Sequence, residues 1–168
     1  MDFLAEAIEK LAATPQRAAE IVQGLSEQQL SWKPTEFFSL RESILHLRDI
    51  DVEGYEKRIQ VILSEDSPML PDVDGGKLAQ ERNYNAQPIE PALADLARSR
   101  AASVEKLRAC SEADLGRRAE MEGVGKIELR RLLELWMQHD ADHLKDMAEL
   151  RRSAEQNEHP SLREHEAA

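Results

Sequence analysis

Helical periodicity is the feature that most restricts how this chain can fold. Apolar residues recur at steps of three and four in four long segments, and little of the chain alternates as a half-buried strand would. The segments run from about Phe3 to Gln23, from Ser39 to about Leu63, from Pro88 to about Ala109 and from about Lys126 to Arg152. Four helices of this length predict an all-α protein built as a four-helix bundle.

Local signals refine the ends of these helices. Thr14 and Pro15 stand in an N-cap and N1 arrangement, so the first segment is expected to be a kinked helix or two pieces, ending at Gly24. Ser39 is followed three residues later by Glu42, which predicts a capping box at the start of the second helix.

A long link, "SEDSPMLPDVDGGKLAQERNYNAQ", separates the second and third helices. It exceeds a tight turn and is rich in Pro, Gly, Asp and Ser, so it allows these two helices to run in the same direction as a crossover connection. Its "DVDGG" stretch does not predict a calcium loop, because Gly76 and Lys77 occupy the positions where an Asp or Asn and then a Gly are needed.

Composition indicates one globular domain with a polar tail. At 168 residues and 41% hydrophobic, the chain can bury a sizeable core. We expect the bundle to span residues 1–152 and residues 153–168, "SAEQNEHPSLREHEAA", to form a frayed tail in which His159 and His165 have no role. The only cysteine, Cys110, excludes an internal disulfide and a multi-cysteine metal site.

Charge and hydropathy narrow the class of partner. The chain has 33 acidic and 22 basic residues, a formal charge of −11 without a segregated basic patch, which argues against nucleic-acid binding. No apolar run reaches the roughly 18 residues of a membrane span, and residues 1–10 lack the basic-then-apolar order of a secretory signal. The sequence therefore predicts a soluble cytoplasmic protein.

Two histidines interrupt the apolar stripe of the fourth segment, "LLELWMQHDADHLKDM". His139 and His143 continue the row of Leu132 and Trp136, so they belong to the buried face. Residues at i and i+4 project one turn apart on one face, a spacing at which two imidazoles can reach one metal ion. The alternative is a pair of core histidines with hydrogen-bond partners.

A third histidine, His46, lies close to the apolar face of the second helix. Sites in bundles are built from facing helices, so His46 can meet the other two histidines in the interior. Its row is acidic, with Glu42, Asp49 and Glu53, although each of these also fits a solvated edge.

These features resemble the DinB-like, or DinB/YfiT, family of metalloenzymes over about Leu4 to Leu150. The resemblance is carried by "SLRESILHLRD", by "LARSRAASVEKLRACSEADL" and most specifically by "VGKIELRRLLELWMQHDADHLKDM" with its H-D-x-x-H ending. It implies an up-down-down-up bundle, commonly a homodimer, with a divalent metal on residues matching His46, His139 and His143. Many members have Trp-Ser where this chain has Phe38 and Ser39, a difference that affects only local packing.

Three imidazoles suit zinc or nickel and leave a coordination position open for water or for a substrate thiolate or carboxylate. Asp140 is the expected acceptor for an imidazole N–H, and Asp49 the expected base or extra ligand. Arg100 interrupts an apolar row and is a candidate to hold an anionic substrate; alternatively its stem packs and its head reaches solvent. Trp136 could wall the pocket, although core packing explains it better.

The resemblance also suggests a reaction. Characterised members of the family are thiol-dependent, namely S-transferases that use bacillithiol or mycothiol and a maleylpyruvate isomerase, and others are described as hydrolases. We therefore expect a metal-dependent S-transferase that joins a low-molecular-weight thiol to a small electrophile. A metal-dependent hydrolase and a non-enzymatic metal-binding or small-ligand-binding protein of the stress-response type are the alternatives.

Overall fold

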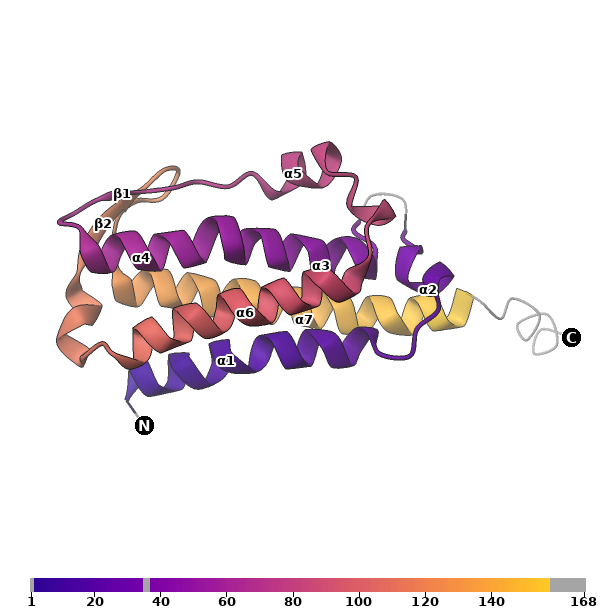
Figure 1. Ribbon diagram of the computed structural model, residues 1–168, viewed down its shortest axis with the longest axis horizontal. Coiled ribbons are helices and arrows are strands. Elements are labelled where there is room, and N and C mark those ends of the chain that lie inside the picture. Colours follow the sequence, from indigo (N-terminus) through magenta and orange to yellow (C-terminus); the bar gives the residue numbers. More distant parts are fainter. Residues whose placement is uncertain (1, 35–36, 158–168) are drawn as a thin grey trace, which may run out of the picture.

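Four long helical rods dominate the computed structural model, which describes residues 2–34 and 37–157 (Figure 1). The first rod is α1 (Phe3–Val22), and the second joins α3 (Leu40–Asp49), a π-helical turn (Ile50–Tyr55) and α4 (Glu56–Ser64). The third and fourth are α6 (Ile89–Arg108) and α7 (Leu129–Asn157). The shorter helices are α2 (Glu27–Ser31), α5 (Gly75–Glu81) and two 3₁₀ turns, Tyr84–Ala86 and Glu112–Gly116.

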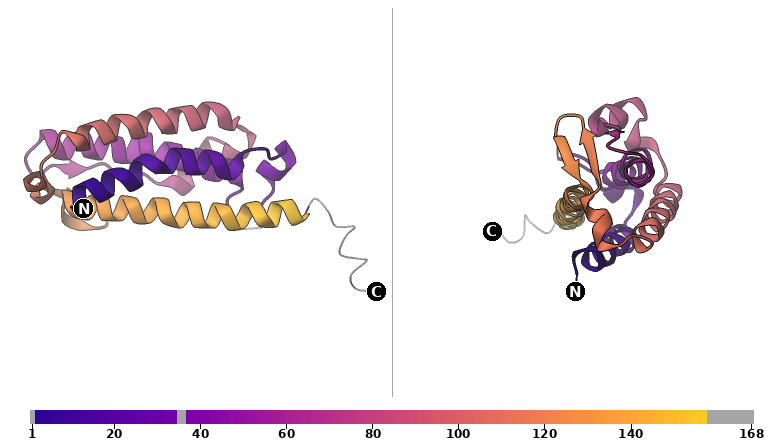
Figure 2. Two further views of the ribbon diagram at one scale, coloured as in Figure 1. Left: turned by 90° about the horizontal axis from the view of Figure 1, so that it is seen from below. Right: turned by 90° about the vertical axis from the view of Figure 1, so that its left-hand side faces the viewer.

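The rods run up, down, down and up, as the sequence predicts. The link after α4 returns along the whole bundle through α5, so α6 starts at the same end as α3 and runs parallel to it (Figure 1). In the end view of Figure 2 the four rods surround a common axis, with α1 between α6 and α7. No helix of the described residues is long and apolar enough to cross a membrane.

The helix ends agree with the sequence signals in part. The side chain of Ser39 accepts a hydrogen bond from the Glu42 backbone N–H, which confirms the predicted cap, but the Glu42 carboxylate bonds to Lys33 instead of closing the box. The first helix is a single α-helix that continues through Pro15. Proline has no N–H for the carbonyl four residues earlier, Leu11, and the guanidinium of Arg100 bonds that oxygen at 2.7 Å.

A small sheet, which the sequence did not predict, covers one end of the bundle. Strand β1 (Met69–Leu70) pairs in parallel with β2 (Arg118–Met121), and β2 pairs antiparallel with β3 (Gly125–Glu128). The fourth helix consequently begins at Leu129, not near Lys126, and it continues to Asn157, beyond the predicted Arg152. Strands of two to four residues are too short for their alternation to be recognised in a sequence. His159 and His165 lie outside the described residues.

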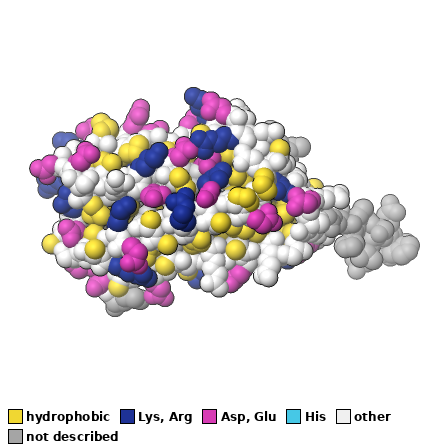
Figure 3. Space-filling model, viewed as in Figure 1, with side chains coloured by type: hydrophobic (Ala, Val, Ile, Leu, Met, Phe, Trp, Pro, Cys, Tyr) yellow, Lys and Arg dark blue, Asp and Glu magenta, His cyan; other side chains and the backbone are white. Residues whose placement is uncertain are grey.

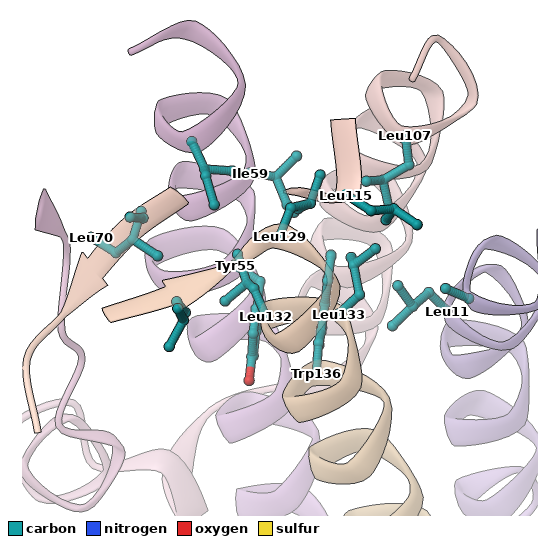
Figure 4. Packing of buried hydrophobic residues seen from close by; sticks show 14 of the residues in the cluster. Leu11, Tyr55, Ile59, Leu70, Leu107, Leu115, Leu129, Leu132, Leu133 and Trp136 are labelled. Atoms are coloured by element: carbon teal, nitrogen blue, oxygen red, sulfur yellow. The ribbon is translucent and has the colours of Figure 1, made fainter. Parts of the chain in front are cut away.

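The buried apolar residues form two clusters, one toward each end of the bundle. In the cluster near the sheet, Leu11 of α1 points toward Leu133 and Trp136 of α7, and Leu70 of β1 closes the end (Figure 4). Tyr55 stacks on Trp136 with ring centroids 4.6 Å apart. Trp136 is therefore a core residue, which is the role that the sequence analysis favoured over that of a pocket wall.

Acidic and basic side chains are interspersed on the face of the molecule seen in Figure 3. Lysines and arginines alternate there with aspartates and glutamates and form no continuous basic surface. This distribution agrees with the net charge of −11 and gives this face no attraction for a phosphate backbone.

Candidate metal centre

The structure brings the three predicted histidines together between α3 and α7. His46 Nε2 lies 3.1 Å from His143 Nε2 and 3.4 Å from His139 Nε2. One nitrogen from each ring falls within 4.8 Å of the other two, and among the described residues no other histidine, cysteine or carboxylate joins such a group. The i, i+4 spacing on α7 aligns two rings, and the antiparallel packing of α3 supplies the third.

The described residues leave part of the hydrogen-bonding capacity of the histidine cluster unused. Nδ1 of His46 and Nδ1 of His139 are buried without a hydrogen-bond partner among the described residues. Burial lowers the pKa of His46 to about 3, with a further contribution from the two neighbouring imidazoles. Burial and then His139 lower the pKa of His143. His46 and His143 are therefore neutral at pH 7, as metal ligands must be.

The spacing of the Nε2 atoms fits a single metal ion. Nitrogens bound to a tetrahedral zinc at about 2.0–2.1 Å lie about 3.3–3.4 Å from one another. The two measured separations, 3.1 and 3.4 Å, bracket that value. With the proton of each ring on Nδ1, the three Nε2 lone pairs face one another without a donor, and one cation can accept all three.

Other side chains and one glycine enclose the histidines. Phe38 lies against His46, and Tyr55 against His139, with centroid separations of 5.3 and 6.0 Å. Gly75, at the start of α5, approaches so closely that a Cβ there would lie 2.7 Å from His46 Cε1 and 2.8 Å from Nδ1. The link between α4 and α6 therefore covers His46, and only glycine fits at this contact.

Asp140, which the sequence analysis expects to accept from an imidazole N–H, lies beside His139. Its Oδ1 atom is 3.6 Å from His139 Nδ1, a contact slightly too long for a hydrogen bond. The buried carboxylate also accepts from Thr14 Oγ1 at 2.7 Å and from Arg100 Nη1 at 2.6 Å. Burial opposes its ionisation, but the contact with His139 and the charge of Arg100 hold the pKa of Asp140 below its ordinary value.

Arg100 is 2% exposed, so its head does not reach solvent. Its five N–H groups all bond to the chain: two to Asp51 Oδ1, two to Asp140 and one to the Leu11 carbonyl. The guanidinium also lies over Trp136, 4.6 Å from the ring centroid. An anionic substrate would have to displace one of these partners, so the observed contacts do not support the substrate-holding role expected of Arg100.

Asp49 is buried on another side of α3, outside the histidine group. Its carboxylate accepts from Arg82 Nη1 at 2.8 Å and also bonds to Arg48 and to the hydroxyl of Tyr84. The structure thus joins Asp49 to the link and to two arginines, and it does not bring this side chain to the metal ligands, where the sequence expected it.

Two residues near the site were missed by the sequence analysis. Asp51 is 1% exposed and pairs with Arg100, but it belongs to the π-helical turn, where α-helical periodicity misplaces side chains. Gly75 belongs to the "DVDGG" stretch, and its glycine pair is the signal in the sequence for a close backbone approach.

Comparison with known proteins assigns the family. Residues 10–147 match the sequence profile of the DinB superfamily. The chain belongs to the DinB superfamily. The match includes α3 and the first five turns of α7, the two segments that carry the three histidines. It confirms the resemblance seen in the sequence.

A solved structure shows the same DinB superfamily fold. YfiT from Bacillus subtilis, described as a probable metal-dependent hydrolase with an unusual four-helix bundle topology, superposes with a TM-score of 0.83. The two sequences are 19% identical, and the match covers 91% of this chain and 89% of YfiT. At this identity the comparison establishes the fold alone. No curated protein matches the chain.

Proposed function

We propose that His46, His139 and His143 bind one divalent metal ion, zinc or nickel, and that the protein is a metal-dependent enzyme. The observation that carries the proposal is the convergence of three imidazoles, in which His46 Nε2 lies 3.1 and 3.4 Å from the Nε2 atoms of His143 and His139, close to the spacing of a tetrahedral site. Membership of the DinB superfamily and the description of YfiT as a probable metal-dependent hydrolase support it.

The bound ion would act as a Lewis acid that lowers the pKa of a thiol or water reaching its open position. The chain's own residues hold and shield the ligands. Asp140, fixed by Arg100 and Thr14, places a negative charge beside His139 Nδ1 and favours the tautomer whose Nε2 is free to bind. We therefore assign Arg100 a positioning role that acts through Asp140.

Transfer of a low-molecular-weight thiol to a small electrophile is the reaction we propose. Asp49, the carboxylate expected as the base, is held by Arg82, and Asp140, the expected acceptor beside His139, is held by Arg100. A thiol needs little help from a protein base, because its pKa of about 8.5 starts far below the value of about 15.7 for water. Hydrolysis is the second candidate, which the description of YfiT favours.

Elemental analysis after metal loading tests the metal site. Wild-type protein should carry about one ion per chain. Alanine at His46, His139 or His143 should weaken binding by more than about a hundredfold, since loss of an outer hydrogen-bond partner alone typically costs 10–100-fold. His159→Ala is the control and should bind as the wild type does. Equal metal content in all of these proteins would refute the proposal.

Activity assays separate the candidate reactions. We expect metal-dependent turnover of a chloronitrobenzene electrophile with one or more of cysteamine, cysteine, bacillithiol and mycothiol. Turnover of a nitrophenyl ester without thiol would favour the hydrolase, and no turnover of either substrate by metal-loaded protein would favour a binding protein. The homodimer and the cytoplasmic location stay predictions; light scattering that finds a monomer would refute the first.

A further inference from the structure

A surface pocket of about 510 Å³ opens beside the histidine cluster, where the start of α3 and the segment before it face the second half of α7. His143 reaches this pocket and is the metal-ligand candidate that lines it. Phe37, Phe38 and Leu150 give it apolar walls, and Phe37 leaves 71% of its surface exposed. An exposed aromatic ring beside a concave surface is a common feature of sites that bind small molecules.

The charged residues of this pocket are acidic. Asp146 and Glu149 line it from α7, and no lysine or arginine is found among its described lining residues. Both carboxylates are exposed, and neither forms an ion pair or a hydrogen bond with another described side chain. Their spacing of three residues puts them on one face of the helix, and His143 precedes Asp146 by the same step.

This arrangement combines two aromatic rings with two negative charges that have no partner among residues 2–34 and 37–157. An organic cation satisfies both, since its charge meets the carboxylates and an ammonium group is also attracted by aromatic faces. An anion would be repelled by the carboxylates, and a neutral molecule would gain only the apolar contacts. His143, the metal-ligand candidate in the lining, would set the direction in which such a molecule points.

We propose that this pocket is the substrate pocket of the metal centre and that it selects small organic cations. The ammonium or guanidinium group of the ligand lies against Asp146 and Glu149, its apolar body against Phe37 and Phe38, and its reacting end toward His143. The inference rests on the proposed function, because His143 belongs to both the metal site and the pocket.

The experiment uses three probes with the same phenyl ring and different charge: phenethylamine, phenethyl alcohol and 3-phenylpropionate. Binding to the full-length protein, metal-free and zinc-loaded, is measured by NMR titration. In the metal-free protein we expect phenethylamine to bind roughly three- to tenfold more tightly than the alcohol, and the carboxylate to bind most weakly. Raising the salt concentration should reduce the preference.

The double variant Asp146→Asn/Glu149→Gln should remove the preference for the cation. The matched control is Asp142→Asn, which removes an exposed charge one turn earlier on α7, near His143 but outside the pocket lining. The control should keep the wild-type preference. Because all substitutions are at exposed positions, the variants should fold, and a thermal melt verifies this.

Three results would overturn the inference: similar binding of all three probes to the wild type, binding of none of them, or an unchanged preference in the double variant. Each is distinguishable from failure of the proposed function. The preference depends on carboxylates and is scored without metal, whereas the proposed function is tested by the metal content of the histidine variants and by turnover of the metal-loaded protein.

Discussion

The Asp51–Arg100–Asp140 network and the histidine cluster both place polar side chains inside the bundle, and they meet where Asp140 follows His139. They differ in how completely the chain satisfies them. Every N–H group of Arg100 donates to an oxygen of the protein and each carboxylate receives two of these bonds, so that among the described residues Asp51 Oδ2 is the one network atom left without a partner. The histidines instead turn three Nε2 atoms toward each other and leave two buried Nδ1 atoms without a partner in the described part of the chain.

The contrast distinguishes a structural cluster from a functional one. Buried polar groups in proteins are nearly always paired, so a self-complementary network is explained by the fold alone. Three imidazoles whose Nδ1 atoms carry the protons present only acceptors to one another, and such a cluster is complementary to a cation from outside the chain. If this interpretation is right, damage to the network should reduce stability, and damage to the histidines should reduce metal binding.

The largest effect is expected from Arg100→Met. Without the guanidinium, Asp51 and Asp140 remain buried without a cation, so the free energy of unfolding measured in urea should fall by about 3–5 kcal/mol. Arg98→Met, on the exposed face of the same helix, is the control and should change it by less than about 0.5 kcal/mol. Equal effects of the two substitutions would show that the network contributes no more than a surface pair.

A smaller effect is expected from pH in the metal-free protein. Below pH 6.5 the unfolded chain protonates His46, while the folded chain keeps it neutral because its pKa is lowered to about 3. The unfolded state then binds more protons, so stability decreases as pH falls through this window, on the order of 2 kcal/mol between pH 7 and 4.5.

Urea denaturation of wild type and His46→Ala across this pH range measures the effect. The lowered pKa of Asp140 also makes stability fall toward acid pH, but it does so in both proteins and cancels in the comparison. The wild type should therefore lose more stability than the variant. Parallel curves would mean that His46 titrates alike in the folded and unfolded chains.

The smallest effect is expected from Gly75→Ala. Its Cβ would meet the His46 ring at 2.7 Å, so the ring or α5 must move, and zinc affinity should fall about tenfold. Gly76→Ala is a close control, because its Cβ meets only the Asp74 carboxylate at 3.5 Å and helix propensity changes alike in both variants. Equal zinc affinities would show that the link does not constrain the site.

The sequence predicted the parts of this protein that depend on long, regular signals. Four helices, the parallel course of the second and third, and the Ser39 cap were all confirmed, because periodicity over many residues and capping chemistry are local. The meeting of His46 with His139 and His143 could be predicted because bundle geometry turns inward-facing positions of neighbouring helices toward one another.

What escaped prediction depends on contacts between distant segments. Pro15 remains inside a helix because Arg100, 85 positions away, bonds the carbonyl that proline leaves free. Asp49 accepts hydrogen bonds from Arg82 and Tyr84 of the link and not from a group at the metal site. Helical periodicity does not reveal these partners, because they lie on another segment. Strands β2 and β3 form a hairpin, and β2 also pairs with β1, which belongs to the link. Each strand is too short for its alternation to be recognised in the sequence.

The π-helical turn Ile50–Tyr55 has a consequence for how related chains should be aligned. A π turn is equivalent to an α-helix with one inserted residue, and one residue rotates everything beyond it by about 100°. The turn thus sets the angular phase between His46 on one side and the buried Ile59 and Ile62 on the other. In a homologue with one residue fewer in this segment, the two halves of the rod would be rotated relative to each other. If its metal ligand faced inward at the position of His46, different positions of α4 would have to supply the core residues.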